Sequence, residues 1–481
     1  MHTRNSDLEL RLAEAIGRPL PPPIEDPALE ATVRAAVTAS GQTVVALDDD
    51  PTGVQTVHDV AVLADWAPET LAAEFDRAPA LFFILTNSRS LDAADAAALN
   101  RELGRRLQDA ASAAGRGLSI VSRSDSTLRG HYPAETDALA EALGGVDGVL
   151  ICPAFFEGGR VTVDDTHFLV DGDRVVPVAE TEFAQDATFG YRARTLPAWV
   201  EEKTGGIVPA SAVVSITLED VRVGGAERVA TVLREVAGGL PVIVNVVDYA
   251  DLWTVVLGIL TAEAAGKRFL YRTGASFVRA RAGIPARPLL TRAELLADAS
   301  PVRAPGLVVV GSHVRRSTEQ LEQLLTLPGT TPVELRVPRL LAGDAEQAEE
   351  IARASSVVNE AIMNGETAVL FTSRQVERPR DRQELDVARI VSGSLVQVVE
   401  GLRVKPGWVI GKGGITSSDV GTRGLGAQRA EVLGQVRPGV PVWRLGPESR
   451  FPGLSYVVFP GNVGGPETLR EIVADLVGAP D

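Results

Sequence analysis

The stretch TVVALDDDPTG (43–53) runs a short apolar segment directly into three consecutive carboxylates. Its apolar half has the length and the β-branched content of a buried strand. Asp48, Asp49 and Asp50 therefore follow the carboxyl end of that strand, where ligands bind in open parallel sheets. Three adjacent carboxylates repel one another, so a metal, hydroxyl donors or arginines are expected to offset their charge. A solvated acidic turn with Asp48 as a helix cap is the alternative.

Outward from this strand, short apolar runs alternate with segments of helical periodicity. The alternation predicts an α/β protein with two α/β domains and largely parallel sheets. Further strands are expected in the first half at 81–87, 118–125, 148–155, 212–216, 241–247 and 268–274, and in the second half at 306–313, 332–337, 367–373, 407–414 and 455–461. Helices are expected near 92–113, 134–143, 316–327, 344–363 and 383–402.

The expected organisation is a leader followed by two domains. Residues 1–40 form the N-terminal leader, residues 41–285 the first domain and residues 300–481 the second. The segment 281–305 is rich in Pro, Ala and Arg and has no strand pattern, so it is expected to be the linker.

The composition excludes several classes of protein. The net charge of −16, from 63 acidic and 47 basic residues, would repel a nucleic acid. Cys152 is the only cysteine, which excludes an intrachain disulfide and a zinc site built on several cysteines. The chain has neither an apolar run of about 20 residues nor an apolar start, so no membrane span is expected. The expected location is cytoplasmic.

A second polar stretch, SRSDSTLRGHYPAE (122–135), follows the strand expected at 118–125. Arginine binds carboxylates through paired hydrogen bonds, and aspartate accepts hydrogen bonds from sugar hydroxyls. The stretch therefore favours a pocket for a hydroxy acid, although a polar loop before a helix would have a similar composition. Its candidate binding residues are Arg123, Asp125, Ser126, Thr127 and Arg129.

A third stretch, PAFFEGGRVTVDD (153–165), places Arg160 after two glycines and before a strand-like VTV. A hairpin would explain the glycines without any ligand. Arg160 is nevertheless a candidate for a further contact with an anion.

Three glycine-rich segments follow expected strands in the second half: GSHVRRSTEQ (311–320), GKGGITSSD (411–419) and FPGNVGG (459–465). Backbone N–H groups in such turns can bind a phosphate. Glycine turns also end many strands that bind nothing, and GxxxxGK[ST] is not matched. Three such loops in one domain favour a nucleotide site, and Lys412 adds a cation to the second loop.

Taken in order, these motifs resemble those of the four-carbon acid sugar kinase family, and the resemblance spans most of residues 43–475. The D-D-x-T-G and K-x-D-S-T-L-R-G motifs of that family are similar to DDDPTG (48–53) and RSDSTLRG (123–130). Its next landmarks resemble PAFFEGGRVT (153–162) and ETEFAQD (180–186). Its nucleotide-binding loops resemble GSHVRRSTEQ (311–320), GGITSSD (413–419) and GNVG (461–464).

The resemblance implies a sugar-acid-binding domain at 41–285, a nucleotide-binding domain at 300–481 and chemistry in an interdomain cleft. The implied activity is ATP-dependent phosphorylation of a primary hydroxyl of a small sugar acid in carbohydrate catabolism, with ATP and Mg²⁺. The catalytic candidates are Asp49, Asp50 and Asp125, and the substrate-binding candidates are Arg123, Ser126, Thr127, Arg129 and Arg160. The ATP-binding candidates are Ser312, Lys412, Gly413, Gly414, Ile415, Thr416, Gly461 and Gly464; no metal ligand is assigned.

Three positions depart from the family pattern. Arg123 stands where a lysine is common, Ile415 where an acid is frequent, and Phe459 where a basic residue is frequent. Lys412 could supply the charge missing at Phe459. These differences, with the segment 425–453, suggest a distinct branch. Its substrate could differ from threonate and erythronate, and 3-oxo-isoapionate is one such acid.

Two other functions remain open. Asp48, Asp50 and Thr52 fit the D-x-D-x-T pattern of a haloacid-dehalogenase-type phosphatase, but the later lysine and paired acids of that fold are not found convincingly. A sugar-acid sensor without catalysis is supported only by Ile415 and Phe459. The sequence does not identify the acid, the hydroxyl phosphorylated, the catalytic base or the oligomeric state, for which a homodimer is left open.

Overall fold

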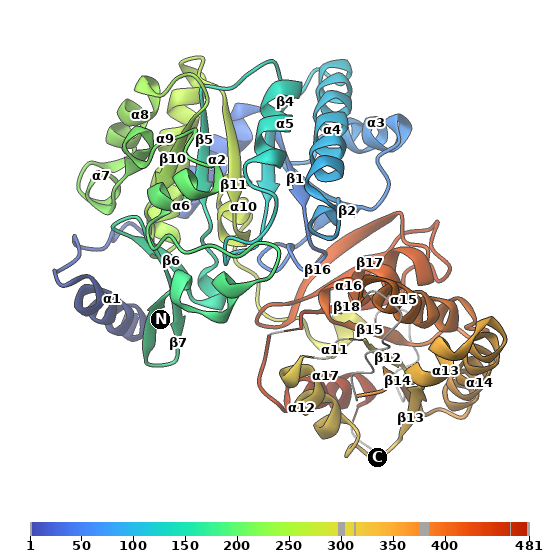
Figure 1. Ribbon diagram of the computed structural model, residues 1–481. Helices are drawn as coiled ribbons and strands as arrows, with labels where there is room; N and C mark the ends of the chain where they lie inside the picture. Colours follow the sequence, from blue (N-terminus) through green and yellow to red (C-terminus); the bar gives the residue numbers. More distant parts are fainter. Residues whose placement is uncertain (1, 297–303, 312–313, 375–383, 462, 479–481) are drawn as a thin grey trace. The chain divides into compact units, whose positions relative to one another are not determined.

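The computed structural model describes residues 2–296, 304–311, 314–374, 384–461 and 463–478 (Figure 1). The chain folds into two compact units. Unit 1 comprises Met1–Gly53 and Trp66–Ala286, and unit 2 comprises Val54–Asp65 and Arg287–Asp481. Both units are α/β with largely parallel strands, so the fold class predicted from the sequence is confirmed. Chain segment 54–65 leaves the first unit and joins the second.

The strands of the large sheet in unit 1 are parallel and pair in the order β3-β1-β4-β11-β5-β10-β9. They are β1 (Gln42–Asp48), β3 (Leu81–Leu85), β4 (Gly117–Arg123), β5 (Gly148–Cys152), β9 (Val214–Ile216), β10 (Leu240–Val244) and β11 (Phe269–Thr273). Strands such as β3, LFFIL, are buried at every residue because both faces of the sheet are covered.

Strand β1 is flanked by β3 on one side and by β4 on the other. After β1 the chain therefore forms β3 on one side of this strand and then β4 on its other side. In doubly wound sheets such a reversal opens a crevice beyond the carboxyl ends of the strands. Asp48, the last residue of β1, is in register with Leu85 and Arg123. The three acidic residues therefore follow β1 at the reversal point.

Helices cover both faces of this sheet, and those expected near 92–113 and 134–143 are confirmed. The helices described in unit 1 are α1 (His2–Ile16), α2 (Leu29–Ser40), α3 (Pro68–Asp76), α4 (Ala93–Ala113), α5 (Ala134–Ala142), α6 (Leu196–Lys203), α7 (Leu218–Arg222), α8 (Gly225–Glu235), α9 (Tyr249–Ala264) and α10 (Ala275–Arg281).

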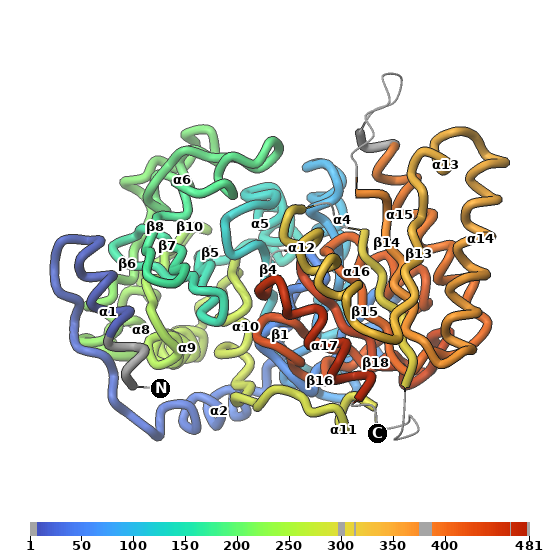
Figure 2. The backbone as a smooth tube through the Cα atoms, turned by 90° about the horizontal axis from the view of Figure 1, so that it is seen from below, coloured from blue at the N-terminus to red at the C-terminus, as the bar shows by residue number. Residues whose placement is uncertain are grey.

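A small antiparallel sheet adds β6 (Arg160–Val163), β7 (Thr166–Asp171) and β8 (Arg174–Pro177) to unit 1. The hairpin considered for the third polar stretch is therefore present. Helix α1 lies against this sheet (Figures 1 and 2). Leu12 of α1 is fully buried and packs in one cluster with Val161 and Phe168. Part of the predicted leader is thus packed onto unit 1.

In unit 2 the parallel strands are ordered β13-β14-β12-β15-β18, and β17, β16 and β2 continue the sheet in antiparallel fashion. The strands are β2 (Val60–Leu63), β12 (Leu307–Val310), β13 (Thr330–Leu335), β14 (Thr367–Thr372), β15 (Trp408–Lys412), β16 (Arg429–Arg437), β17 (Val440–Leu445) and β18 (Ser455–Phe459). The helices are α11 (Arg292–Leu295), α12 (Arg315–Leu324), α13 (Val337–Ala342), α14 (Asp344–Met363), α15 (Glu384–Glu400), α16 (Gly414–Asp419) and α17 (Thr468–Val477).

Unit 2 repeats the arrangement of unit 1, because its first parallel strand, β12, is flanked by β14 and β15. The antiparallel pair β16 and β17 lies in segment 425–453, for which no strand is expected from the sequence. Trp443 of β17 is buried, so the segment contributes to the core. Phe459 at the end of β18 is also fully buried.

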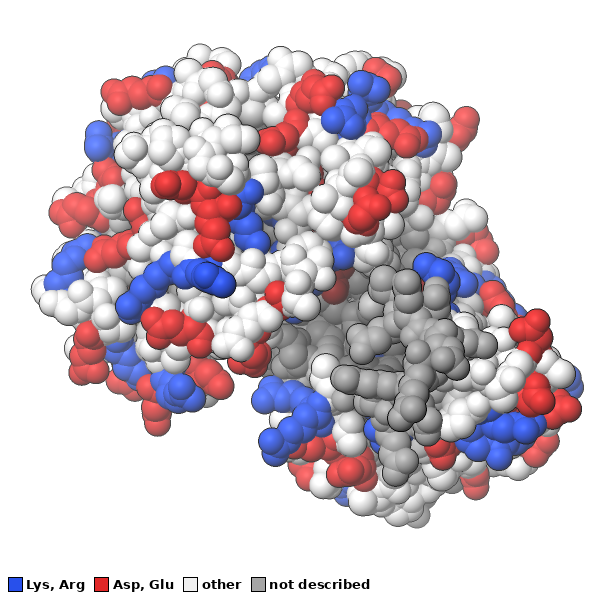
Figure 3. Space-filling model, viewed as in Figure 1, with Lys and Arg blue, Asp and Glu red and all other residues white. Residues whose placement is uncertain are grey.

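On the face shown in Figure 3, acidic and basic side chains are interspersed over the described surface. None of the helices in the described ranges is both long and apolar enough to cross a membrane.

A buried ion pair fixes the N-terminal segment on unit 1. The side chains of Arg222 and Asp251 are both 0 % exposed, and the Nε–Oδ1 distance is 2.8 Å. Arg222 also donates to the carbonyl oxygen of Pro21 at 2.8 Å and lies 2.9 Å from a carboxylate oxygen of Glu9 in α1. Removing the guanidinium would leave two carboxylates without their counter-ion in a dry environment.

We therefore expect Arg222→Met to lower the free energy of unfolding by about 3–5 kcal/mol. The matched control is Arg228→Met, since Arg228 is 52 % exposed in its pair with Asp220. That exposed pair is expected to contribute no more than about 1 kcal/mol. Urea unfolding followed by circular dichroism measures both variants. Equal losses would show that burial does not set the strength of these pairs.

Candidate functional site

Two arginines neutralise the three carboxylates at the end of β1. Arg123, the last residue of β4, places Nη1 3.0 Å from Asp48 Oδ1 and 3.7 Å from Asp49 Oδ1. Arg89, which follows β3, donates from Nη2 to Asp49 Oδ1 at 2.6 Å and from Nε to Asp49 Oδ2 at 3.2 Å. Its Nη1 lies 3.4 Å from Asp50 Oδ2. The charge compensation expected from the sequence is therefore provided by arginines from both neighbouring strands.

The three carboxyl groups differ in their access to solvent. The side chains of Asp48 and Asp49 are 2 % and 3 % exposed, whereas Asp50 is 21 % exposed. Burial raises the pKa of Asp48 to about 7, against the opposing charge of Arg123. Asp50 is the group of the three that a substrate could contact most readily.

Thr52 and Gly53 complete this turn. Thr52 donates from Oγ1 and from its backbone N–H to Asp50 Oδ1, at 2.6 and 2.9 Å. Burial would raise the pKa of Asp50, but the charge of Arg89 and the bonds from Thr52 outweigh it, and the pKa is lowered. A Cβ at position 53 would lie 2.1 Å from Asp48 Oδ2, so only glycine fits there. Asp50 is therefore held ionised in a fixed orientation.

The loop after β4 contributes a second charged group. Asp125 Oδ2 accepts hydrogen bonds from Arg129 Nε at 2.8 Å and from Thr127 Oγ1. Arg129 also lies 3.8 Å from Asp186 and stacks over the ring of Phe183. Burial opposes ionisation of Asp125, but the charges of Arg89 and Arg129 hold its pKa well below the usual range. The charge of Arg89 thus acts on Asp125 as well as on the carboxylates after β1.

His167 of β7 holds the backbone of this loop through a hydrogen bond. Its Nε2 lies 2.8 Å from the carbonyl oxygen of Ser126, and its Nδ1 lies 2.9 Å from Thr162 Oγ1. Because a carbonyl only accepts, the proton is on Nε2, and Nδ1 accepts from the threonine hydroxyl. Burial lowers the pKa of His167 to about 4, so the ring is neutral near pH 7. The small sheet therefore positions the loop that contains Asp125.

Arg272, near the end of β11, adds an ion pair and a hydrogen bond to the cluster. Its Nη1 donates to Glu135 Oε2 at 2.5 Å and to Ser122 Oγ at 2.8 Å. Gly130 has φ of +122°, and a Cβ there would lie 2.6 Å from Arg272 Nη2 and 3.2 Å from Asp49 Oδ2. The glycine of the RSDSTLRG motif is thus required for the close approach of these two side chains.

Arg160 lies at the start of β6. Its Nη1 donates to the carbonyl oxygen of Gly158, and its guanidinium lies 5.8 Å from the ring centre of Phe155. Burial lowers the pKa of Arg160, and the charges of Asp125, Arg129 and Asp171 also act on it. Arg160 therefore lies within electrostatic reach of the second charged group.

The structure thus brings the predicted residues of unit 1 into one charged cluster and adds others that sequence reasoning missed. The additional residues are Arg89, Glu135, His167 and Arg272. Arg89 could have been suspected, because the polar segment TNSRS (86–90) follows a buried strand just as the acidic turn does. No comparable signal marks Glu135 or His167, whose partners are far away in the sequence.

In unit 2 the glycine loops follow the carboxyl ends of adjacent parallel strands. Lys412, the last residue of β15, donates from Nζ to the carbonyl oxygens of Pro460 and Gly461 at 2.6 and 3.2 Å. Its Nζ lies 4.3 Å from the ring centre of Phe459. Burial, together with the charge of Arg316, lowers the pKa of Lys412 to about 7. Lys412 therefore lies beside Phe459, where the sequence suggested that it could supply the missing charge.

The remaining nucleotide candidates lie around Lys412. Gly413, with φ of +111°, donates from its N–H to the carbonyl oxygen of Phe459 at 2.8 Å. Thr416 is buried, and a Cβ at Gly311 would lie 2.3 Å from its Oγ1, so the two loops are in contact. Gly414 begins α16, Ile415 is 61 % exposed, and Gly464 has φ of +79°. Ser312 lies outside the described residues.

Arg374 was not identified from the sequence. It follows β14, and its Nη2 lies 2.9 Å from Thr372 Oγ1 and 3.3 Å from the carbonyl oxygen of Val310 at the end of β12. Together with Lys412 and Arg316, it places basic side chains after three neighbouring strands. Such an edge suits a polyanion such as a triphosphate.

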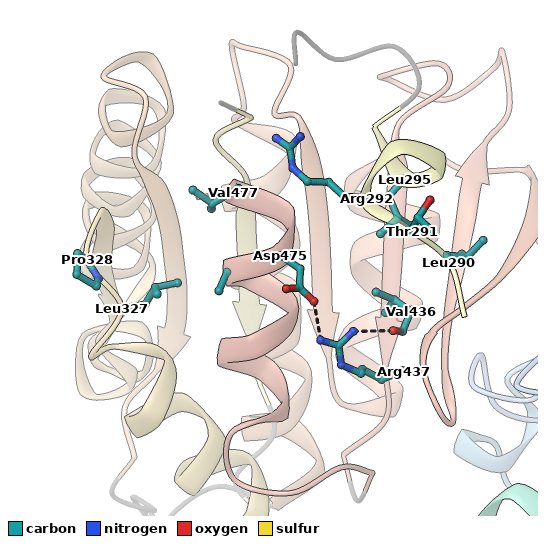
Figure 4. Close-up of a pocket in the computed structure, with 12 residues that line it drawn as sticks. Leu290, Thr291, Arg292, Leu295, Leu327, Pro328, Val436, Arg437, Asp475 and Val477 are labelled. Carbon is teal, nitrogen blue, oxygen red and sulfur yellow. Dashed lines mark hydrogen bonds and ion pairs between the residues drawn. The ribbon is translucent and has the colours of Figure 1, made fainter. Parts of the chain in front are cut away.

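A pocket of about 760 Å³ lies elsewhere in unit 2 (Figure 4). It is lined by Leu327 after α12 and by Val477 at the end of α17, with Arg437 hydrogen-bonded to Asp475 at 2.6 Å. Helices that follow parallel strands end at the amino edge of the sheet, so this pocket is at the edge opposite to the glycine loops. Among the described residues, no three His, Cys, Asp or Glu side chains are grouped as a metal site.

Comparison with known proteins matches each half of the chain to a domain family. Residues 44–281 match the sugar-binding N-terminal domain model, and residues 307–469 match the nucleotide-binding C-terminal domain model. The matches agree with the division of polar clusters between the two units.

The chain is similar to D-threonate kinase of Salmonella typhimurium, with 29 % identity over 374 residues, covering 73 % of this chain and 78 % of that protein. A D-threonate kinase of Bordetella bronchiseptica is 36 % identical over 147 residues, covering 29 % of this chain and 34 % of that protein. A crystal structure from Haemophilus influenzae, assigned to the DUF1537 family, superposes with a TM-score of 0.58 at 18 % identity, covering 89 % of this chain and 98 % of that one. At this identity the structural match supports the fold alone.

The neutral His167 makes a testable contribution to stability. Its pKa is about 4 in the folded protein against 6.5 for the unfolded chain, so the unfolded chain binds the proton more strongly. The resulting stability is present above pH 6.5 and is lost as the pH falls toward 4, by about 3 kcal/mol in total. We expect His167→Gln, which does not titrate, to lose less stability between pH 7 and pH 4.5 than the wild-type protein. Urea midpoints at the two pH values test this, and equal pH dependence in both proteins would contradict it.

Proposed function

We propose that this chain, which belongs to the four-carbon acid sugar kinase family, is a sugar-acid kinase that transfers the γ-phosphoryl group of ATP to a primary hydroxyl. The main support is the cluster of alternating arginines and aspartates beyond β1, because it can bind a small polyhydroxy anion. Further support comes from the D-threonate kinases similar to this chain and from the basic edge of unit 2.

Asp50 is proposed to orient the attacking hydroxyl. It is the most exposed of the three carboxylates after β1, and its low pKa keeps it ionised as a hydrogen-bond acceptor. The hydroxyl oxygen attacks the γ-phosphorus, the bond to the β–γ bridging oxygen breaks, and the hydroxyl proton passes to Asp50 and then to water. Asp49, clamped by Arg89, and Asp125 are proposed to accept hydrogen bonds from other hydroxyls of the substrate.

The residues of unit 2 are proposed to hold the ATP phosphates. Lys412, Arg316 and Arg374 offer positive charge at one sheet edge, and the loops containing Gly413, Gly414 and Gly464 offer backbone N–H groups. Ser312, Ile415, Thr416 and Gly461 remain proposed nucleotide contacts. When bound, Mg²⁺ neutralises charge on the phosphate oxygens during transfer. Because Mg²⁺ commonly keeps several waters and binds through substrate phosphates, it is proposed to enter with the nucleotide.

The substrate is proposed to be D-threonate or a related acid, with a branched oxo acid such as 3-oxo-isoapionate as the alternative within the same class. A sensor without catalysis is less favoured, because Lys412 provides a cation beside Phe459, where the resemblance indicates that a basic residue is missing. The proposed site of action is cytoplasmic.

The kinase is tested by measuring ADP formation with Mg²⁺, ATP and a panel of four- and five-carbon sugar acids. We expect turnover with one acid or a few related ones. For the active acid, Asp50→Asn is expected to lower kcat by about 100-fold or more with a small change in KM, because an amide cannot accept the proton. Asp173→Asn, at a fully exposed side chain, is the matched control.

Two outcomes would contradict this function. Binding of a sugar acid and of ATP without any ADP formation would favour the sensor. Release of phosphate from sugar phosphates without ATP would favour the phosphatase.

The role of Lys412 is tested by the pH dependence of ATP binding. Since its pKa is about 7 in the free protein, the side chain loses its charge as the pH rises through that value. ATP would favour the charged form, so binding takes up a proton and the affinity falls by up to about tenfold per pH unit above pH 7. We expect calorimetry between pH 6 and 8.5 to show this loss in the wild-type protein.

Lys412→Met is the matched variant, because it preserves the aliphatic chain but has no titrating group. It should bind ATP about 10- to 100-fold more weakly at pH 6.5, and its pH profile should retain only the titration of ATP itself. The same slope in both proteins would exclude Lys412 from the phosphate site.

A further inference from the structure

Most arginines of the unit 1 cluster already have a carboxylate partner. Arg89 pairs with Asp49 at 2.6 Å, Arg123 with Asp48 at 3.0 Å, Arg129 with Asp125 at 2.8 Å and Arg272 with Glu135 at 2.5 Å. Each of these four guanidiniums therefore already donates to an acidic side chain of the protein.

Arg160 differs from the other four. In the part of the chain that the structure describes, no carboxylate oxygen lies within 4 Å of its guanidinium. Its Nε is buried and has no hydrogen-bond partner, which is also true of Arg123, but Arg123 has Asp48 and Asp49 within 4 Å of its Nη1. A buried, unpaired N–H donor on a cation is costly, and a bound anion would remove that cost.

The guanidinium is nevertheless held in a fixed position. Phe155 and Arg160 exchange backbone hydrogen bonds of 3.1 and 2.9 Å across the turn. Nη1 donates to the carbonyl oxygen of Gly158, and a Cβ at Gly158 would lie 2.3 Å from Nη1 and 2.4 Å from the ring of Phe155. The glycine therefore makes room for the guanidinium. Nε and Nη2 remain as the side-on pair of donors that matches the two oxygens of a carboxylate.

The surroundings of Arg160 fit the rest of a sugar acid. Arg160 begins β6, and Thr162 of the same strand contacts His167, whose Nε2 bonds the carbonyl oxygen of Ser126 next to Asp125. The charges of Asp125, Arg129 and Asp171 act on Arg160 as well. A carboxylate held at Arg160 would leave the hydroxyls of the same molecule near the carboxylate of Asp125.

We propose that Arg160 is the specificity-determining residue that binds the substrate carboxylate. This inference rests on the proposed function for the identity of the substrate class. It assigns the anion to Arg160 in place of Arg123 and Arg129, which already have acidic partners.

The test is calorimetric binding of D-threonate, D-erythronate and D-threonamide, the neutral analogue. We expect the wild-type protein to bind at least one of the two acids and to bind the amide about 100-fold more weakly than D-threonate. Arg160→Gln should weaken acid binding about 100-fold and leave amide binding within about threefold, so that the preference for the acid disappears. Arg160→Lys should lie between the two, because it keeps the charge and loses the paired donors.

Two further variants keep the result interpretable. Gly158→Ala should displace the guanidinium without removing its charge and should weaken acid binding in the same selective way. Arg174→Gln, at an exposed arginine of the same small sheet, should change neither ligand. Thermal unfolding of each variant confirms that it is folded.

The outcomes separate the inference from the proposed function. If the acid is phosphorylated by the wild-type protein but Arg160→Gln keeps its preference for acid over amide, the inference is wrong and the kinase stands. If acid binding depends on Arg160 but no ADP forms, the inference stands and the kinase fails. If the wild-type protein binds neither four-carbon acid, the inference is overturned, whereas the kinase stands or falls with ADP formation across the wider panel of acids.

Discussion

The mutual neutralisation of aspartates and arginines beyond β1 is the constraint on which unit 1 depends. Two carboxylates that are 2 % and 3 % exposed would each cost several kcal/mol without compensation. Arg123 and Arg89 can reach them only because β4 and β3 flank β1 on opposite sides. The strand order and the charge balance therefore require each other, and the site forms where the winding of the sheet reverses.

Much of the fold could be predicted from the sequence, because buried parallel strands such as LFFIL (81–85) are short apolar runs separated by helical periods. The antiparallel strands β16 and β17 were missed. Their pattern, RAEVLGQVR (429–437) followed by VPVWRL (440–445), alternates partly exposed residues with buried ones and contains glycine and proline. The inclusion of segment 54–65 in unit 2 depends on pairing with β16, more than 350 residues later in the sequence, which no local pattern encodes.

The candidate site was predictable where chemistry is local. Asp49 and Asp125 follow strands, and polar residues at such positions are unusual enough to notice. Glu135 was not predictable, since its role is to accept a hydrogen bond from Arg272, 137 residues away. His167 likewise acts through a carbonyl oxygen 41 residues away. A residue that positions another is identified by its contacts. Contacts between residues so far apart in the sequence follow from the order of the strands in the sheet.

The distinction between paired and unpaired arginines also explains how such a site can select a polyhydroxy anion. Asp125, paired with Arg129, has a lowered pKa, so it stays ionised and fixed and accepts a hydroxyl with little reorganisation. The pair has no net charge, and it therefore does not attract a second carboxylate. Arg160, without a carboxylate partner among the described residues, is the member of the cluster whose charge a ligand would complete. The aspartates paired with arginines thus recognise hydroxyl groups, and the guanidinium of Arg160 recognises the carboxylate.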